Sequence, residues 1–203
     1  MLTAFLLAVA AGAVPVGSDD ASQVARLIDL LALEPGMSVA DVGAGSGEMT
    51  TLMARRLGAA SRVYSTDIND ERLAEIRTAV ARDGLENVIV VKGAERATNL
   101  PDACCEAVFI RDVYHHFVDP AAMNRSLLAA LKPGGRLAVI DFAPGPDSKV
   151  PSGVPENRGG HGIRPEQIVE EIGAAGFTLE RAPEDWEGKL FLVVFRKPRV
   201  DSK

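Results

Sequence analysis

The chain has 203 residues, 47% of them hydrophobic and 25% charged, which is the length and balance of one soluble globular domain. A formal net charge of −6 without a Lys/Arg-rich run argues against nucleic-acid binding, because phosphate contacts dominate that affinity. The two cysteines, Cys104 and Cys105, are adjacent, which excludes a disulfide framework and the spacing of a cysteine metal site. No metal is therefore predicted.

The N-terminal segment, residues 1–20, is predicted to stand apart from a domain at 21–203. Leu2 to Ala13 is apolar and ends in small residues, as the hydrophobic region and cleavage site of a signal peptide do. No Lys or Arg precedes Arg26, so the basic region of such a peptide is missing, and the run is too short for a stable membrane span. Two alternatives stay open: a cleaved signal peptide with export to the periplasm, or a retained helix packed on a cytoplasmic protein.

From residue 18 to 142, helical patterns and short β-rich runs alternate. The first helix begins near Ser18 and ends at Pro35-Gly36. Strands are then predicted at Ser38–Val42, Arg62–Ile68, Asn87–Lys92, Ala107–Val113 and Gly135–Phe142. Helices are predicted between them at Glu48–Leu57, Asp70–Arg82 and Pro120–Leu131. Such alternation predicts a parallel sheet with helices on both faces.

The last third of the chain departs from this rhythm. Ala143–Ile163 is rich in Gly and Pro and longer than most connections, which is typical of a disordered loop or of a lid over a site. A helix is predicted at Pro165–Ala175, followed by strands at Phe177–Arg181 and Leu190–Arg196. Because no helix separates these two strands, we expect an antiparallel pair at the end of the sheet.

A glycine-rich segment, Asp41-Val42-Gly43-Ala44-Gly45-Ser46-Gly47, stands where the first strand turns into a helix. Glycines there allow a sharp turn and a close approach to a ligand, at the carboxyl end of the strands where ligands bind. The dinucleotide fingerprint G-x-G-x-x-G places its third glycine one residue later. Asp41 would also repel a pyrophosphate, whereas it suits a cationic amino-acid group. Asp67, after the second strand, can accept hydrogen bonds from both ribose hydroxyls, a feature that NAD enzymes share.

The pattern Asp41-x-Gly43-x-Gly45-x-Gly47 with Asp67 resembles the class I S-adenosylmethionine-dependent methyltransferases, over roughly Leu27 to Lys197. Three further segments are similar to the small-molecule branch, including the ubiquinone/menaquinone-type methyltransferases: Asn99-Leu100-Pro101, Arg111 to His116, and Leu131 to Leu137. The resemblance implies an α/β fold, Rossmann-like and doubly wound, with a mostly parallel seven-stranded sheet and an antiparallel C-terminal strand. It implies S-adenosyl-L-methionine as cofactor and a small molecule as methyl acceptor.

The resemblance also implies cofactor-binding residues around the carboxyl ends of the first four strands. These are Asp41, Gly43, Ala44, Gly45, Gly47, Asp67, Ile68, Ala94, Glu95, Arg111 and Asp112. By that resemblance, the residues of the glycine turn would line the methionine and ribose, and Asp41 would contact the amino group directly or through water. Asp67 would hold the ribose hydroxyls, Ile68 would pack on the adenine face, and Ala94 and Glu95 would lie near its edge. Arg111 and Asp112 would approach the methionine and the transferring methyl.

The sequence offers several candidates for proton removal. A sulfonium already carries an activated methyl group, so alignment for in-line displacement is the main task and can supply roughly 7–11 kcal/mol. Some acceptors also need to lose a proton. Tyr114, His115 and His116 follow the fourth strand, where the family's substrate meets the methyl, and histidine titrates near neutral pH. Packing against the next helix is the competing interpretation for each of them.

Absent motifs narrow the function further. No Asn/Asp-Pro-Pro-aromatic segment follows the fourth strand, and neither cysteine follows a proline. These absences argue against the family's enzymes that methylate amino groups of nucleic-acid bases and those that act on pyrimidine C5. Two other functions stay open, an NAD(P)-dependent oxidoreductase on a related fold and a non-catalytic module that binds S-adenosylmethionine. Nothing in the sequence predicts an oligomeric state.

Overall fold

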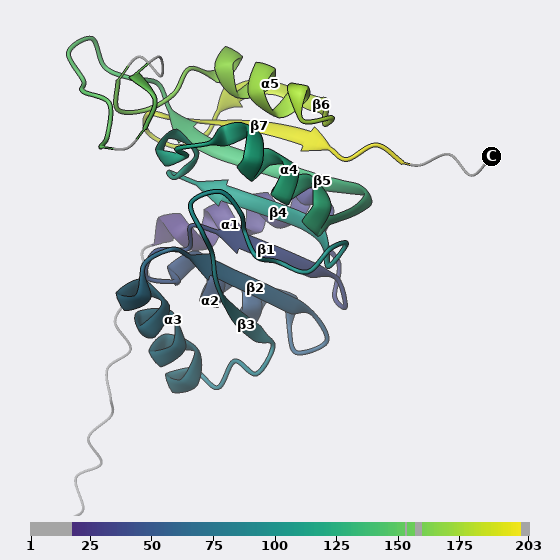
Figure 1. Cartoon of the computed structure of the whole chain (residues 1–203). Coiled ribbons are helices and arrows are strands. Elements are labelled where there is room, and N and C mark those ends of the chain that lie inside the picture. The colour runs from purple at the N-terminus through teal and green to yellow at the C-terminus, as the bar shows by residue number, and fades with distance from the viewer. Residues whose placement is uncertain (1–17, 153, 157–159, 200–203) are drawn as a thin grey trace, which may run out of the picture.

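The computed structural model describes residues 18–152, 154–156 and 160–199 (Figure 1). Seven strands form one sheet in the order β3-β2-β1-β4-β5-β7-β6. Strands β1 to β5 are parallel, and β7 is antiparallel to both of its neighbours, β5 and β6. Their bounds are β1 Ser38–Val42, β2 Arg62–Asp67, β3 Val88–Lys92, β4 Cys105–Arg111, β5 Leu131–Phe142, β6 Thr178–Asp185 and β7 Leu190–Arg196. The predicted Rossmann-like, mostly parallel sheet is confirmed.

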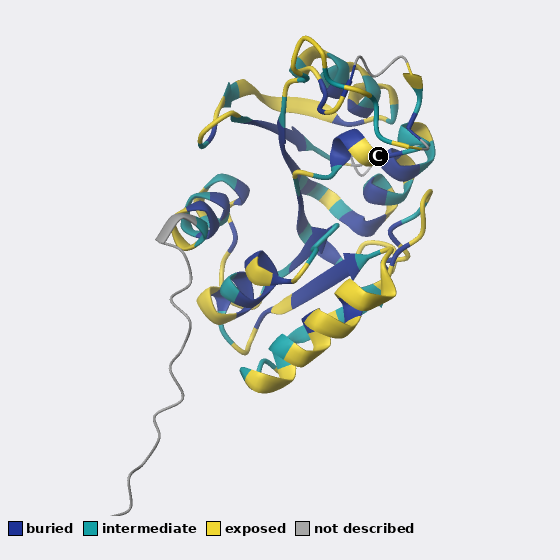
Figure 2. Ribbon diagram, turned by 90° about the vertical axis from the view of Figure 1, so that its left-hand side faces the viewer, coloured by how far each residue is buried: buried dark blue, intermediate teal, exposed yellow. Residues whose placement is uncertain are grey.

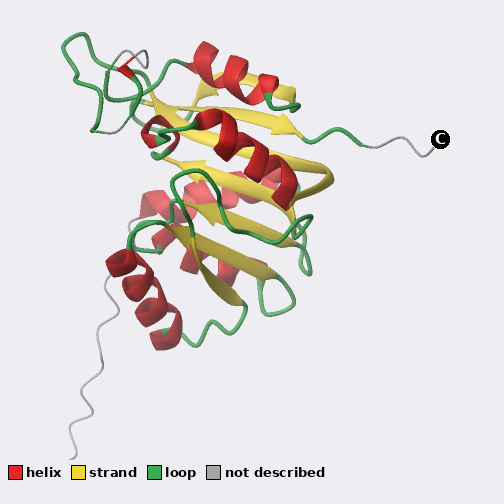
Figure 3. Cartoon of the chain, viewed as in Figure 1, coloured by secondary structure: helices red, strands yellow, loops and turns green. Residues whose placement is uncertain are grey.

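Helices cover both faces of the sheet (Figure 3). They are α1 Ser18–Leu31, α2 Glu48–Leu57, α3 Asp70–Arg82, α4 Pro120–Ala130 and α5 Pro165–Ala174. In Figure 1, α1 and α2 lie behind the sheet and α4 and α5 in front of it, while α3 runs beside β2 and β3 at the edge. Two of the helices begin at side-chain caps, since Asn69 accepts hydrogen bonds from Glu71 N and Arg72 N, and Asp119 accepts one from Ala122 N.

The apolar core lies on both sides of the central strands (Figure 2). Along β4, Val108 and Ile110 pack toward α4 and α5, whereas Ala107 and Phe109 pack toward α1 and α2. Strands β5 and β7 alternate in the same way. Because side chains on a strand alternate between faces, strands buried on both sides must be continuously apolar.

Three strands, β4, β5 and β6, have a boundary that differs by two residues or more from the one that the sequence predicts. β4 ends at Arg111 rather than Val113, because Asp112 takes a left-handed backbone (φ 60°) and a 3₁₀ turn, η1 (Tyr114–His116), follows. β5 begins at Leu131, which pairs with Cys105, so α4 ends before the predicted Leu131. β6 continues to Asp185 because its pairing with β7 contains register shifts that carry it past Arg181.

The predicted segment at residues 1–20 falls outside the described residues except for the beginning of α1 at Ser18. Helix α1 is fixed to the turn between β6 and β7, where Trp186 Nε1 donates to Gln23 Oε1 at 2.9 Å and the Arg26 guanidinium lies 4.2 Å from the Trp186 ring centroid. Among the described residues, no helix combines the length and apolarity needed to cross a membrane.

Candidate functional site

The glycine-rich turn after β1 is held by the end of β2. Gly43 N and Ala44 N both donate to the carbonyl oxygen of Thr66, at 2.8 and 3.0 Å. Gly45 N donates to Asp67 Oδ2 at 3.0 Å. Three consecutive backbone donors of the turn are therefore satisfied by two residues at the carboxyl end of the neighbouring strand, which fixes the turn relative to Asp67.

The three glycines of the turn have different physical roles, although all have positive φ, at 77°, 55° and 83°. A Cβ on Gly43 would lie 2.6 Å from Val113 Cγ1, and one on Gly47 would lie 2.9 Å from Ile76 Cγ1. A Cβ on Gly45 would meet nothing within 4 Å. Gly43 and Gly47 thus permit close packing, whereas Gly45 leaves open space beside the Asp67 carboxylate.

A pocket of about 370 Å³ lies at the carboxyl ends of β1, β2 and β3 and beside the segment after β4. This is the edge at which ligands bind in open parallel sheets. Among its walls are the predicted residues Gly43, Asp67, Ile68, Ala94 and Glu95. Other predicted residues do not line it: Asp41, Ala44, Gly45, Gly47, Arg111, Asp112, Tyr114 and His115.

Asp67 and Ile68 give the pocket a polar and an apolar wall side by side. The Asp67 carboxylate accepts from Gly45 N through Oδ2 and from Asn69 N through Oδ1, at 3.0 and 2.9 Å. Each oxygen keeps a further lone pair that can accept a ligand hydroxyl. The side chain of Ile68 is 57% exposed, which presents an uncovered apolar surface at the pocket.

Asp41 lies beneath the turn instead of in the pocket. Strand alternation turns its side chain toward α2, where it is 3% exposed and accepts a hydrogen bond from Thr50 Oγ1 at 2.6 Å. Burial raises the pKa of this carboxyl from 3.8 to about 7, against the smaller lowering effects of the Thr50 hydrogen bond and of the Arg111 charge. The predicted contact of Asp41 with the cofactor's amino group stays a prediction.

The two residues that end β4 face different neighbours. The Arg111 guanidinium lies 3.3 Å from Asp20 Oδ1, so it joins the sheet to α1. Asp112 is exposed in its left-handed conformation, and its N–H donates to the carbonyl oxygen of Ile140 at 2.8 Å. A non-glycine residue at positive φ is uncommon and is often found at functional sites. The predicted roles of both residues toward the cofactor stay predictions.

The candidate bases lie in η1, just past β4. The Tyr114 hydroxyl is in the core, where it donates to Glu171 Oε2 at 3.0 Å and accepts from Asn124 Nδ2 at 2.8 Å. His115 is 1% exposed, and its Nδ1 lies 2.8 Å from Asp141 Oδ1. Only His116 of this group lines the pocket; its side chain is exposed, and partial desolvation together with the charge of the neighbouring His115 lowers its pKa. Proton removal by Tyr114 or His115 stays a prediction.

Sequence reasoning missed part of the pocket wall. The missed residues are mostly small or apolar, and most stand at strand ends, in the connections after β3 and β4, or in α4; they include Thr66, Gly93, Thr98, Val113, Phe117 and Met123. The usable signal was position, since Val113 lies two residues after the buried parallel strand β4 and Phe117 directly after η1.

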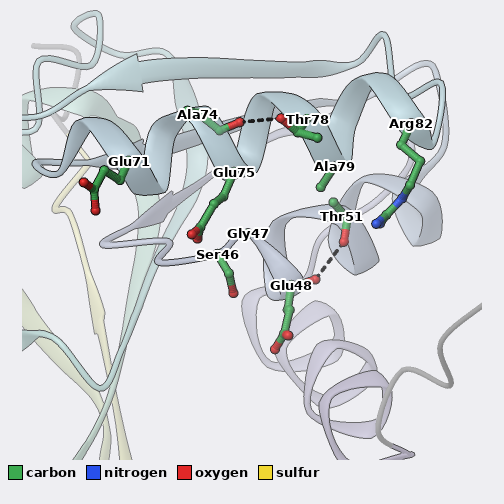
Figure 4. A pocket seen from close by; sticks show the side chains of 10 residues that line it. All are labelled: Ser46, Gly47, Glu48, Thr51, Glu71, Ala74, Glu75, Thr78, Ala79 and Arg82. Atoms are coloured by element: carbon green, nitrogen blue, oxygen red, sulfur yellow. Dashed lines mark hydrogen bonds between the residues drawn. The ribbon is translucent and has the colours of Figure 1, made fainter.

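A second, more open groove lies between α2 and α3 (Figure 4), with a volume of about 600 Å³. Ser46 and Gly47 of the glycine turn reach it, but Asp67 and Ile68 do not line it. Its walls carry the carboxylates Glu48, Glu71 and Glu75, and Glu48 stands in the first turn of α2. Three carboxylates against one guanidinium, that of Arg82, leave the groove with negative charge, so it is a poor anion site.

Comparison with known proteins gives a consistent family signal in sequence. Residues 40–139 match the model of a methyltransferase domain. The ubiquinone/menaquinone biosynthesis C-methyltransferase UbiE of Shewanella frigidimarina is 33% identical over 117 residues, which are 57% of this chain and 47% of that protein. UbiE of Shewanella oneidensis is 32% identical with the same coverage. The chain spans about half the length of these curated relatives.

Solved structures agree in fold. A SAM-dependent methyltransferase from Aquifex aeolicus has a TM-score of 0.72 at 24% identity, covering 85% of this chain and 88% of that one. The phosphoethanolamine N-methyltransferase 2 of Haemonchus contortus, in complex with S-adenosyl-L-methionine, has a TM-score of 0.69 at 16% identity, with coverages of 88% and 53%. The [4+2]-cyclase SpnF has a TM-score of 0.74 at 19% identity, with coverages of 89% and 82%. A cyclase among these neighbours means that fold alone does not fix the reaction.

The Gly43→Ala substitution is expected to destabilise the fold by about 2 kcal/mol or more, because it combines a left-handed backbone with a Cβ that overlaps Val113. Gly84→Ala is the matched control, with φ 63° and no atom within 4 Å of the added Cβ, and should cost only about 1 kcal/mol. Urea unfolding measures both. The double substitution with Val113→Ala should recover part of the loss, and equal effects of the two single substitutions would contradict the overlap.

The Asp41→Asn substitution is expected to remove a pH dependence of stability. The folded chain binds the Asp41 proton more tightly than the unfolded chain, so this residue costs stability as pH rises from about 4 to about 7. The free energy of unfolding of the variant should therefore rise relative to that of the wild type across this pH window, by about 1 kcal/mol or more at pH 7, since one pKa unit is about 1.4 kcal/mol. Urea unfolding from pH 4 to 8 measures the difference, with exposed Asp102→Asn as control. Parallel curves for wild type and Asp41→Asn would rule the effect out.

Proposed function

We propose that this chain, which belongs to the class I S-adenosylmethionine-dependent methyltransferases, transfers the methyl group of that cofactor to a small molecule by in-line displacement. The observation that carries the proposal is the pocket beside the glycine turn, whose wall contains both the Asp67 carboxylate, fixed by Gly45 N, and the exposed Ile68. The polar wall at Asp67 suits a ribose, and the adjacent apolar wall at Ile68 suits an adenine ring.

The chain's own residues fit the cofactor in three respects. The Asp67 oxygens keep lone pairs for the two ribose hydroxyls, and charged hydrogen bonds of this kind contribute roughly 1.5–3 kcal/mol. Ile68, which is exposed, offers the flat ring an apolar contact. Gly45 leaves room for close approach without a Cβ. When bound, the cofactor supplies an activated methyl group, so the protein's task is alignment.

A nicotinamide dinucleotide fits less well. The N-terminal turn of α2 carries Glu48, and the adjoining groove carries Glu71 and Glu75, so that a diphosphate at the turn would meet three carboxylates. The sulfonium cofactor has no phosphate and a positive charge, and the same carboxylates favour it. This is the observation against the oxidoreductase alternative.

The acceptor is proposed to be a small, largely apolar molecule. Val113, Phe117 and Met123 line the pocket near His116, and apolar walls with a few polar groups are typical of small-molecule sites. The UbiE relatives, by their name, act in ubiquinone and menaquinone biosynthesis, and they support an acceptor with an apolar ring. The net charge of −6 supports a small molecule over a nucleic acid.

Cofactor binding should depend on Asp67. Asp67→Ala is expected to weaken the binding of S-adenosylhomocysteine by about 10-fold or more, because the variant loses the charged acceptor at the ribose. Titration calorimetry gives the dissociation constant. The matched control is Asp70→Asn, an exposed carboxylate that lies three positions further on and is not part of the pocket wall. An unchanged constant in Asp67→Ala would remove this residue from the cofactor site.

Methyl transfer itself can be measured without knowing the acceptor. The full chain is incubated with S-adenosylmethionine labelled in its methyl group and with a metabolite extract fractionated by polarity. Label is expected in an organic-extractable product, together with S-adenosylhomocysteine, and the Asp67→Ala variant should lose about 10-fold or more of the signal at low cofactor. Tight cofactor binding without transfer to any fraction would favour the non-catalytic module, and selective binding of NAD⁺ would favour the oxidoreductase.

A further inference from the structure

All three histidines of the chain come together at one place. His115 and His116 belong to η1 after β4, whereas His161 belongs to the loop that precedes α5. Their ring centroids are 4.1 Å apart for His115 and His116, 4.8 Å for His115 and His161, and 5.8 Å for His116 and His161. One ring nitrogen of each lies within 4.8 Å of the other two. Since two separate segments supply these rings, the fold, not the local sequence, creates the cluster.

The buried member of the cluster is oriented by a carboxylate. His115 Nδ1 lies 2.8 Å from Asp141 Oδ1, and the same carboxylate accepts from His115 N and Phe142 N. A carboxylate acceptor places the ring proton on Nδ1 and leaves Nε2 with its lone pair. Asp141 is itself fully buried, so this orientation is fixed by the core.

The free ring nitrogen of His115 is the unexplained feature of the cluster. His115 is 1% exposed, and its Nε2 is buried without a hydrogen-bond partner among the described residues. An unsatisfied buried polar atom costs about 1–3 kcal/mol, and such atoms are rare in folded proteins. The contacts of His115 and His161 with the ring of Phe142, at 4.9 and 5.1 Å, account for packing but leave this nitrogen unsatisfied.

We propose that His115, His116 and His161 bind a divalent transition-metal ion of the Zn²⁺ class through one imidazole nitrogen each, with a fourth coordination position open. Three histidines and a free position are an established donor set for zinc, and a buried carboxylate behind a ligating histidine is its usual support. This reverses the expectation from the sequence that no metal binds.

The geometry requires only a small adjustment. Zinc–nitrogen bonds of about 2.0–2.1 Å in a tetrahedral arrangement place the donor nitrogens roughly 3.4 Å apart. The corresponding nitrogens of the cluster lie within 4.8 Å of one another. His116 and His161 are exposed, so their side chains can close this difference by rotation, while His115 stays fixed by Asp141.

The histidine cluster adjoins the pocket of the proposed methyl transfer. His116 also lines the pocket that contains Gly43 and Asp67. The open coordination position of the ion would therefore take an oxygen, nitrogen or sulfur atom of a molecule held at that wall. This last step rests on the proposed function, whereas metal binding itself does not.

The test uses the full chain purified without a polyhistidine tag, stripped with a chelator and titrated with Zn²⁺ by calorimetry and with Co²⁺ by visible absorption. We expect one ion per chain with a dissociation constant of about 1 µM or tighter, and cobalt bands typical of low coordination number. Saturating Zn²⁺ should also raise the unfolding temperature, because the ion binds the folded chain.

The variants identify the ligands. His161→Ala and His116→Ala should each weaken Zn²⁺ binding by about 100-fold or more, since each loses one of three donors. Both residues are exposed, so the variants are expected to fold. Arg164→Ala, an exposed residue of the same loop, is the matched control and should bind as the wild type does. Asp141→Asn keeps all three rings and should weaken binding by about 10- to 100-fold, as expected for a positioning residue.

Failure to bind one ion per chain, or equal affinities of the wild type, His161→Ala and His116→Ala, would overturn the proposal. Loss of binding in only one of these two variants would also overturn it, because the site needs all three donors. Methyl transfer by a chain that binds no metal would overturn this inference and leave the proposed function intact. Stoichiometric Zn²⁺ binding by a chain that neither binds nor uses S-adenosylmethionine would overturn the proposed function and leave this inference intact.

Discussion

The site depends on three hydrogen bonds that the end of β2 accepts from the glycine turn. The carbonyl oxygen of Thr66 and the carboxylate of Asp67 together receive the N–H groups of Gly43, Ala44 and Gly45. Because these bonds connect the turn after β1 to the residue that forms the polar wall, the shape of the pocket and the position of its carboxylate are set together. The positive φ of each glycine is the backbone condition for this arrangement.

Much of the fold could be predicted from local patterns. The bounds of Ser38–Val42, Glu48–Leu57, Asp70–Arg82 and Leu190–Arg196 agree with the sequence prediction, because apolar runs, caps and glycines mark their ends. The end of β4 could not be predicted, since the left-handed backbone of Asp112 is set by its bond to Ile140, which lies on a different strand. The register shifts that lengthen β6 likewise arise from pairing with β7.

Part of the candidate site could also be predicted from the sequence, because its residues follow recognisable parallel strands. Asp67, Ile68, Ala94 and Glu95 meet at the pocket because the carboxyl ends of parallel strands share one edge. Asp41 belongs to the recognised motif, but the alternation of β1 buries it under α2. The histidine cluster had no local signature, since His161 stands in a Gly- and Pro-rich loop far along the chain from His115. Motif spacing detects donors from one segment, not donors that only the sheet brings together.

The antiparallel direction of β7 places the two ends of the folded domain at opposite edges of the sheet. Helix α1 begins at the carboxyl edge of the sheet, where Asp20 forms an ion pair with Arg111 at the end of β4. Strand β7 runs in the opposite direction and ends at the amino edge, where Arg196 lies opposite Arg136 of β5 in the strand register. The start of α1 and the end of β7 therefore lie at opposite edges of the sheet, and only the carboxyl edge carries the pocket. An antiparallel last strand thus keeps the end of the sheet's final strand away from the ligand-binding edge.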